Sequence, residues 1–375
     1  MKSNCKLGYL LLIVWLATSC TANKYLTEGE KFYEGAKIKY KPERKFKDAA
    51  EIQREVNRLV IPDPNSKLLG SRPRPWFYGL AGEVKKEKGV KYWVKTKLGR
   101  PPVLIQNVDI DRNRRQIEST LNNNGYFGAQ VTSNLKERSH AAGVSYLATI
   151  SDPYRYDSIH YAISDSLLQK KVAALKEETL IKKGDRYDLG KLKNERSRLE
   201  KALKDQGYYH FSSEYLLFRA DSTVGNRAVE MYLNLKSTTP ADAGQVYNIK
   251  AVNLYTNYTY KSDSVQIRDS TKTNGINFVQ DQDDFRPEII TEQVLIKPNE
   301  VYRKEKELIT LNRLIQLDVF KYVNIDYVEQ GNQLNANVYL SPYKKKSLRL
   351  ELQAVSKSNS FVGPNFMATF KNRNI

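Results

Sequence analysis

The stretch that decides the fold occurs twice in the chain, as LNNNGYF at residues 121–127 and as LKDQGYY at residues 203–209. In both copies a glycine follows a leucine by four residues, and two aromatic residues come next. Glycine enters the left-handed conformation without steric cost, so Gly125 and Gly207 are each predicted to end a helix. A third helix is predicted without such a glycine. The three helices are expected over about residues 111–124, 189–206 and 303–317.

Two strands are predicted after each of these helices. In the second strand of each pair, apolar and polar residues alternate, which indicates a sheet that is covered on one side only. A further strand and a further helix are predicted upstream of each pair, so a β-α-α-β-β repeat occurs three times and the fold class is α+β. The first strands cover about residues 129–136, 213–219 and 322–329, and the second strands cover 144–150, 229–235 and 334–340.

The spacing of the repeats predicts the domain boundaries. The first domain covers residues 20–151 with an insertion at 65–103, and the second covers 152–238. The third covers 239–343, and its polar stretch at 257–285 is predicted to be a loop. A separate strand pattern follows over residues 344–375. The insertion contains the densest cationic part of the chain, residues 84–100, with seven bases and one acid.

The start of the chain has the pattern of an export signal. Lys2 and Lys6 precede an apolar run at residues 7–16, which is too short to span a bilayer, and small residues then lead to Cys20. This pattern resembles a bacterial lipobox, with residues 1–19 as the signal peptide and Cys20 as the site of lipid attachment. An ordinary signal peptide with cleavage elsewhere is the alternative. The only other cysteine is Cys5, so the mature chain is expected to lack a disulfide, which suits an oxidising periplasm.

The composition favours a binding protein over an enzyme. The formal net charge is +19, which suggests an acidic partner such as a phospholipid or lipopolysaccharide surface, although a solvated lysine-rich surface explains it equally well. Nucleic acid is not expected as a partner of an exported lipoprotein. The chain has no nucleophile elbow or phosphate loop, and its three histidines lack metal-ligand spacing, so neither catalysis nor a cofactor or metal is expected.

The repeat resembles the POTRA domain, which precedes the barrel in the BamA/TamA superfamily of outer-membrane assembly proteins. Residues 64–70 (PNSKLLG) and the stretch 88–103 look most like the lipidated TamA-like (TamL) proteins of Bacteroidetes. Residues 348–355 and 359–374 are similar to the opening hairpin of the family's barrel. Two strands cannot close a barrel, so residues 344–375 are expected to be the first strands of a truncated outer-membrane β-barrel.

This resemblance implies an outer-membrane, lipid-anchored protein whose POTRA region lies in the periplasm and takes part in protein assembly or translocation. The expected partners are unfolded outer-membrane proteins, a TamB-like periplasmic subunit, and membrane lipid through the acylated N-terminus. Exposed sheet edges suit such partners because they pair with extended chains with little sequence demand. An envelope lipoprotein that binds lipid or glycan without insertase activity is the alternative. The edge residues expected to bind partners are Ser213, Tyr215, Leu217, Leu348, Leu350 and Leu352.

Overall fold

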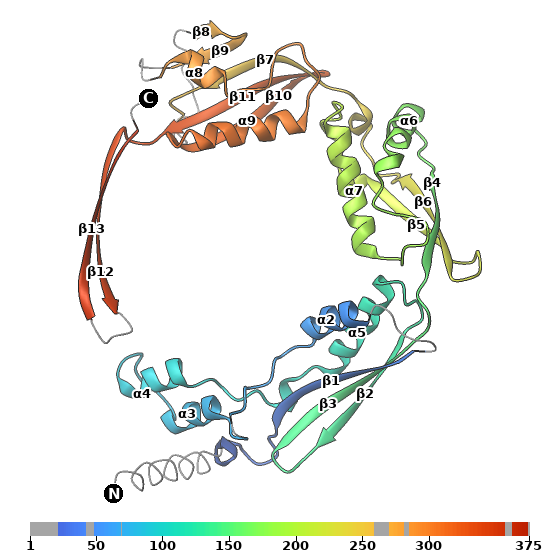
Figure 1. Cartoon of the computed structure of the whole chain (residues 1–375), viewed down its shortest axis with the longest axis vertical. Coiled ribbons are helices and arrows are strands. Elements are labelled where there is room, and N and C mark those ends of the chain that lie inside the picture. Colours follow the sequence, from blue (N-terminus) through green and yellow to red (C-terminus); the bar gives the residue numbers. More distant parts are fainter. Residues whose placement is uncertain are drawn as a thin grey trace, which may run out of the picture. The chain divides into compact units, whose positions relative to one another are not determined.

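The computed structural model describes residues 22–42, 49–68, 70–258, 270–280, 285–356 and 362–373. Cys20 lies outside these ranges. The fold is α+β, as predicted, with helices packed on small sheets (Figure 1). The chain groups into two compact units. One comprises Met1–Ser158, Lys182–Gly190 and Ala220–Glu230, and the other comprises Ile159–Ile181, Lys191–Arg219 and Met231–Ile375.

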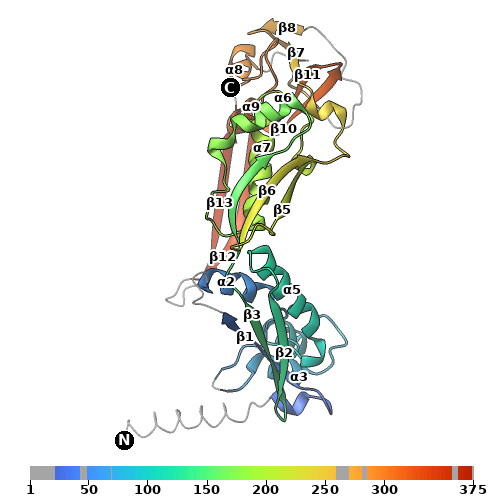
Figure 2. The ribbon, with the colours of Figure 1, turned by 90° about the vertical axis from the view of Figure 1, so that its right-hand side faces the viewer.

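The first sheet has the strand order β1-β3-β2, formed by β1 (Phe32–Pro42), β3 (Ala141–Ile150) and β2 (Gln130–Glu137). β1 runs parallel to β3, and β2 runs antiparallel to it. Helices α2 (Ala49–Leu59) and α5 (Ile110–Asn123) pack on one face of this sheet (Figure 2). Their apolar side chains contribute to its core. The core of this layer contains Ile52, Val56, Ile117, Leu121, Val144, Tyr146 and Ala148.

The insertion in the first repeat contains short helical elements. It contains α3 (Pro73–Ala81), α4 (Val90–Trp93) and the π-helical turn η2 (Val94–Leu98), and the short helix η3 (Ile105–Asn107) follows it. The chain's first described element, η1 (Ala22–Tyr25), packs against α3. The aromatic rings of Trp76 and Phe77 meet edge to face at 4.9 Å within α3.

The second sheet has the order β4-β6-β5, from β4 (Arg155–Tyr161), β6 (Ala228–Leu235) and β5 (Leu216–Asp221). Its helices are α6 (Ser166–Ala174) and α7 (Leu189–Lys204), with short turns η4 (Lys176–Glu178), η5 (Ser213–Tyr215) and η6 (Ala241–Gly244). Leucines of both helices meet leucines of the strands in one apolar layer. That layer includes Leu168, Val172, Leu199, Leu203, Leu216 and Leu233.

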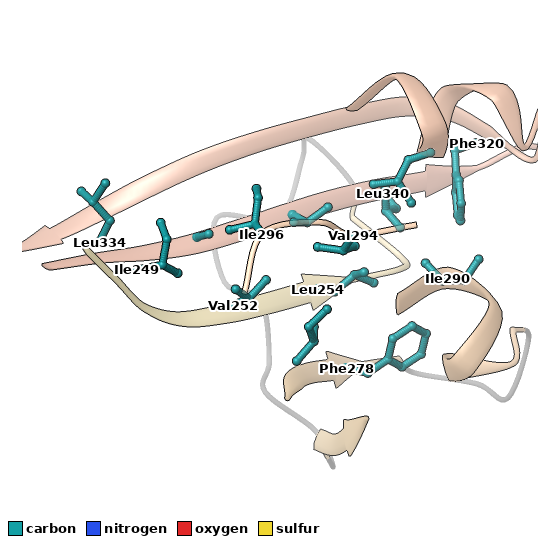
Figure 3. Packing of buried hydrophobic residues seen from close by; sticks show 14 of the residues in the cluster. Ile249, Val252, Leu254, Phe278, Ile290, Val294, Ile296, Phe320, Leu334 and Leu340 are labelled. Carbon is teal, nitrogen blue, oxygen red and sulfur yellow. The ribbon is translucent and has the colours of Figure 1, made fainter. Parts of the chain in front are cut away.

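The third sheet has five strands in the order β10-β11-β7-β9-β8. They are β10 (Phe320–Gln330), β11 (Gln333–Pro342), β7 (Asn248–Tyr255), β9 (Ile276–Val279) and β8 (Ser270–Thr273). Helices α8 (Pro287–Thr291) and α9 (Lys304–Gln316) add Ile290 and Leu314 to its core. Figure 3 shows the side chains that fill this core, from Ile249 and Leu334 at one end to Phe320 and Leu340 at the other.

The prediction of a loop over residues 257–285 is wrong in part, because β8 and β9 form there. Within the polar stretch, Ile276, Phe278 and Val279 are buried in the core of the third sheet. Burial of these apolar residues stabilises the strand. The strand was not predicted because a run of four residues is too short to give a clear alternating pattern. β9 therefore pairs with β7 in parallel and extends the sheet.

The predicted helix ends are confirmed at both glycines. Gly125 has φ +85° and Gly207 has φ +99°, so both take the left-handed conformation. In each case the N–H of the following tyrosine donates to the leucine carbonyl four residues before the glycine, at 3.0 Å in the first copy and 3.2 Å in the second. This bond and the glycine N–H bond together form the Schellman motif, which satisfies carbonyls at a helix end. The third helix uses Asp318 at φ +56° instead.

Each of these glycines also contacts the next repeat. The carbonyl of Gly125 accepts from Tyr154 N–H at 2.8 Å, and the carbonyl of Tyr154 accepts from Tyr187 N–H at 2.9 Å. Gly207 repeats the pattern: its carbonyl accepts from Tyr247 N–H, and that of Tyr247 accepts from Tyr302 N–H, both at 2.9 Å. The aromatic residue two positions after each glycine then packs on these tyrosines, as Phe127 does on Tyr154 and Tyr187 and Tyr209 does on Tyr247 and Tyr302. The same sequence signature thus ends a helix and contacts the next repeat.

Candidate strand-pairing edges

β2 is the end strand of the first sheet, so one side of its backbone faces away from β3. The N–H of Val131 donates to Glu118 Oε1 of α5 at 2.9 Å, which identifies the direction of the open side. Because donors alternate along an antiparallel strand, the N–H groups of Ser133 and Leu135 face the same side as that of Val131. Apart from Val131, the side chains of β2 are exposed. The strand therefore presents a short row of backbone donors beside an accessible surface.

The glutamate that binds this strand recurs in the second repeat. Glu200 lies three residues before Leu203, as Glu118 lies three residues before Leu121, and its Oε2 accepts from Ser213 N–H at 2.9 Å. Burial by itself would raise the pKa of Glu200, but hydrogen bonds from Ser213 and Lys204 outweigh it and lower the pKa. Both carboxylates hold the chain where it enters the edge strand. This pair was not predicted from the sequence, although the shared position of the two glutamates, three residues before the leucine, is its signal.

The prediction that Ser213 and Tyr215 lie in the edge strand of the second sheet is wrong. Both lie in η5, and β5 begins only at Leu216. The polar groups of the backbone explain the difference: the N–H of Ser213 donates to Glu200, and its carbonyl accepts from Arg196 Nε at 2.8 Å. These groups are bonded to α7 and are not available to a strand ladder. Leu217 does lie in β5, which is an end strand, and its side chain is exposed.

In the third sheet the chain itself extends the β7 side, and β10 is the end strand on the other side. In the other two sheets the strand equivalent to β7 ends the sheet, whereas here β9 and β8 extend it. An amide ladder joins three strands: Asn277 Nδ2 donates to Asn253 Oδ1 at 2.8 Å, and Asn253 Nδ2 donates to Asn337 Oδ1 at 2.9 Å. The opposite end strand, β10, runs for 11 residues and exposes Tyr322 and Val328.

The last two strands form a hairpin with one apolar face. β12 (Lys346–Ser356) pairs antiparallel with β13 (Val362–Asn372), and Leu348, Leu350 and Leu352 stand opposite Phe370, Ala368 and Phe366. These three leucines are 65%, 60% and 76% exposed. The alternate positions carry mainly polar residues, among them Arg349, Glu351 and Lys371. The edge residues predicted here thus share one exposed apolar face.

The hairpin contacts the third repeat near the end of β13, where Lys371 approaches Asp318 and the guanidinium of Arg373 lies 4.4 Å from the centre of the Tyr343 ring. Lys371 Nζ donates to the carboxylate of Asp318, the residue that ends α9. This hydrogen bond lowers the pKa of Asp318. The side chain at the third helix end therefore contacts the hairpin, where the first two repeats have a glycine.

Two features, a metal-ion cluster and a membrane-spanning helix, are absent from the described ranges. No group of three or more His, Cys, Asp or Glu side chains there is placed to hold a metal ion. Within the same ranges, none of the helices combines the length and apolar character that crossing a membrane requires.

No protein-family profile matches the chain, and no curated protein matches it. Three solved structures similar to it have sequence identities of 10–13%. POTRA domains 1–3 of the periplasmic domain of Omp85 from Anabaena share 13% identity at a TM-score of 0.28, over 85% of this chain and 98% of that one. BamA from Haemophilus ducreyi lacking POTRA domains 1–3 shares 10% at 0.37, over 57% of this chain and 34% of that one. The chain is also similar to BamA POTRA domains 3–5 of Haemophilus influenzae, with 12% identity and a TM-score of 0.40, over 84% of this chain and 99% of that one.

Proposed function

We propose that this chain is the periplasmic POTRA region of an outer-membrane protein assembly factor, and that it binds extended segments of unfolded β-barrel precursors or of partner subunits. Binding occurs by strand addition at the open edges of the sheets, chiefly β2 and β10, with β5 as a shorter edge. The role is binding and not catalysis. Backbone hydrogen bonds give the affinity, so many different precursor sequences are accepted.

The observation that carries this proposal is the addition of β9 to β7. In the third repeat a four-residue strand from a polar segment pairs in parallel with a sheet edge, buries Ile276 and Phe278, and bonds through the asparagine ladder. The chain thus contains its own example of the pairing proposed for its partners. The exposed surface beside β2 and the 11-residue length of β10 leave room for a longer segment.

We propose that Cys20 is acylated and anchors the chain to the outer membrane, with the POTRA region in the periplasm. Several acyl groups on one cysteine give stable anchoring, whereas a single one gives only marginal binding. We also propose that β12 and β13 are the first strands of an outer-membrane β-barrel. The exposed apolar face of the hairpin supports this role, because barrel strands alternate lipid-facing apolar residues with polar ones. A TamB-like subunit is the proposed periplasmic partner.

Photo-crosslinking tests which edge binds. A photoreactive amino acid replaces Ser133 on β2, Leu217 on β5 or Tyr322 on β10, and the full chain is mixed with a fluorescent peptide of alternating apolar and polar residues. Leu147 is the control position, because it is exposed but lies on the central strand β3, which is paired on both sides. We expect adducts at one or more edges and none at position 147. Equal labelling at all four positions contradicts strand addition.

A pair of variants at one residue tests the backbone contribution. Ser133→Pro removes an N–H that faces the open side of β2, whereas Ser133→Val keeps it and favours a strand. Peptide bound at β2 is expected to be lost in the proline variant and retained in the valine variant. Equal crosslinking yields from a probe at Leu135 in both variants contradict the proposal.

A further inference from the structure

The insertion of the first repeat exposes apolar side chains among bases. α4 and η2 form one helical segment over residues 90–98, and Val90 is 79% and Trp93 is 53% exposed. These two residues are three apart, so they lie next to each other on one helix face. Exposed lysines flank them on both sides in the sequence, and Glu87 is the only acid in the stretch 84–100. The exposed lysines are Lys85, Lys86, Lys88, Lys91 and Lys97.

This segment is fastened to α3. Lys95 Nζ donates to the carbonyl of Gly82 at 2.8 Å and lies 4.6 Å from the centre of the Tyr78 ring. A Cβ on Gly99 would come within 2.9 Å of the Tyr78 backbone, so the end of the segment touches α3 directly. The N–H of Arg100 donates to the Arg74 carbonyl at 3.1 Å. Lys95 therefore holds the segment against α3. Val90 and Trp93 are exposed although the segment that carries them is packed in place.

Helix α3 also contacts η1, the start of the described chain. The ring of Tyr25 in η1 packs so closely on Gly79 of α3 that a Cβ there would overlap it. Ala22 is buried in a small cluster that includes Trp76 of α3. Ala22 is two residues after Cys20, the proposed site of acylation. The insertion therefore packs against the first described residues of the chain, which begin two positions after Cys20 in the sequence.

We propose that residues 84–100 of the insertion are a second membrane contact that binds anionic lipid headgroups. Lysines bind the headgroup phosphates, and Trp93 with Val90 enters the interface between headgroups and acyl chains, the position that tryptophan prefers in membranes. This proposal rests on the proposed location at the outer membrane. The acyl chains at Cys20 hold the chain at the lipid surface, and the insertion determines which face of the first repeat lies on it.

Sedimentation with lipid vesicles tests the proposal in the mature chain, residues 20–375 with Cys20→Ala, so that neither an acyl group nor the apolar run at residues 7–16 contributes. Vesicles of phosphatidylglycerol in phosphatidylcholine are compared with vesicles of phosphatidylcholine alone. The triple variant K88E/K91E/K97E is expected to weaken binding to the anionic vesicles on the order of a hundredfold, from the contribution of each base near such a surface. The matched control is K170E/K171E/K176E, which changes the net charge equally at exposed lysines in α6 and η4, near the exposed Leu167.

Tryptophan fluorescence gives a second readout. Anionic vesicles are expected to shift the emission to shorter wavelengths in the parent chain, and the shift is expected to be lost in Trp93→Phe. Three results overturn the proposal: no binding to anionic vesicles, equal loss in the two triple variants, or equal binding to both kinds of vesicle. Peptide crosslinking at the sheet edges, measured on the same variants, separates this result from the proposed assembly function, because the insertion variants leave the edges intact.

Discussion

Alanine at Gly125 is predicted to destabilise the first repeat more than alanine at Gly128, three residues further on. Both glycines have positive φ, +85° and +76°, so an alanine costs about 1–2 kcal/mol at either position. At Gly125 the new Cβ would also lie 2.9 Å from the Tyr187 carbonyl oxygen and 3.2 Å from that of Tyr154, whereas at Gly128 nothing lies within 4 Å. Backbone atoms cannot rotate away, so the overlap adds a cost of about 1–3 kcal/mol, as overpacking usually does.

Urea unfolding of the purified chain, followed by far-ultraviolet circular dichroism, measures the difference. With a slope of about 2 kcal/mol per molar urea, an added cost of about 2 kcal/mol moves the midpoint of the affected transition by about 1 M. Gly128→Ala, which lacks the overlap, is expected to move the midpoint by about 0.5–1 M, and Gly125→Ala by about 1 M more than that. If the two variants unfold at the same urea concentration, the contact between Gly125 and the next repeat contributes less than its geometry implies, and the double role of the glycine signature is refuted.

Three further outcomes are expected. Glu195, whose side chain is 1% exposed, pairs with Arg198 and accepts from Leu180 N–H. Burial alone would raise its pKa, but the hydrogen bonds lower it, so Glu195→Gln should cost about 3 kcal/mol in thermal melts at neutral pH. The stabilisation by ionised Glu195 is present above the unfolded pKa of about 4.3 and is lost as the pH falls through the lower folded pKa. The difference in melting temperature between the parent and the variant should therefore decrease in acid. Asn253→Leu should cost about 1–3 kcal/mol and speed hydrogen exchange across β9, because it leaves two amides unpaired. Cys20→Ala should leave an unprocessed or soluble species, and unchanged membrane fractionation would count against acylation.

The elements with a strong local signal were predictable from the sequence. Gly125 and Gly207 mark helix ends because few other residues accept a left-handed backbone, and the alternation in β3, β6 and β11 reflects a sheet with one buried face. Asp318 was not predicted to end the third helix, because an aspartate adopts the left-handed conformation only where its tertiary contacts favour it. The strand β9 was missed for a similar reason: only its pairing with β7 gives Ile276 and Phe278 a place to be buried.

The candidate edges were harder to predict than the fold. The prediction placed Ser213 in the edge strand, but its backbone N–H and carbonyl are bonded to Glu200 and Arg196 of α7, which the sequence pattern does not reveal. The exposed leucines of β12 were predicted correctly as one face, because alternation alone determines it. Which edge stays open depends on which parts of the chain cover the others. This depends on tertiary contacts that the local sequence does not show, such as the pairing of β9 with β7.

The residue that ends the second helix of each repeat also indicates which kind of element is docked beside it. Where it is glycine, at 125 and 207, another repeat packs against the bare backbone, and the first tyrosine of that repeat donates to the glycine carbonyl. Where it is Asp318, the neighbouring element is a hairpin that the carboxylate binds through Lys371. A Cβ at position 125 would lie 2.9 Å from the Tyr187 carbonyl oxygen, and one at position 207 would lie 2.6 Å from Val301 Cγ1, so a side chain at either position disturbs the packing of the next repeat. The number of such glycines in a related sequence should therefore equal the number of repeats less one.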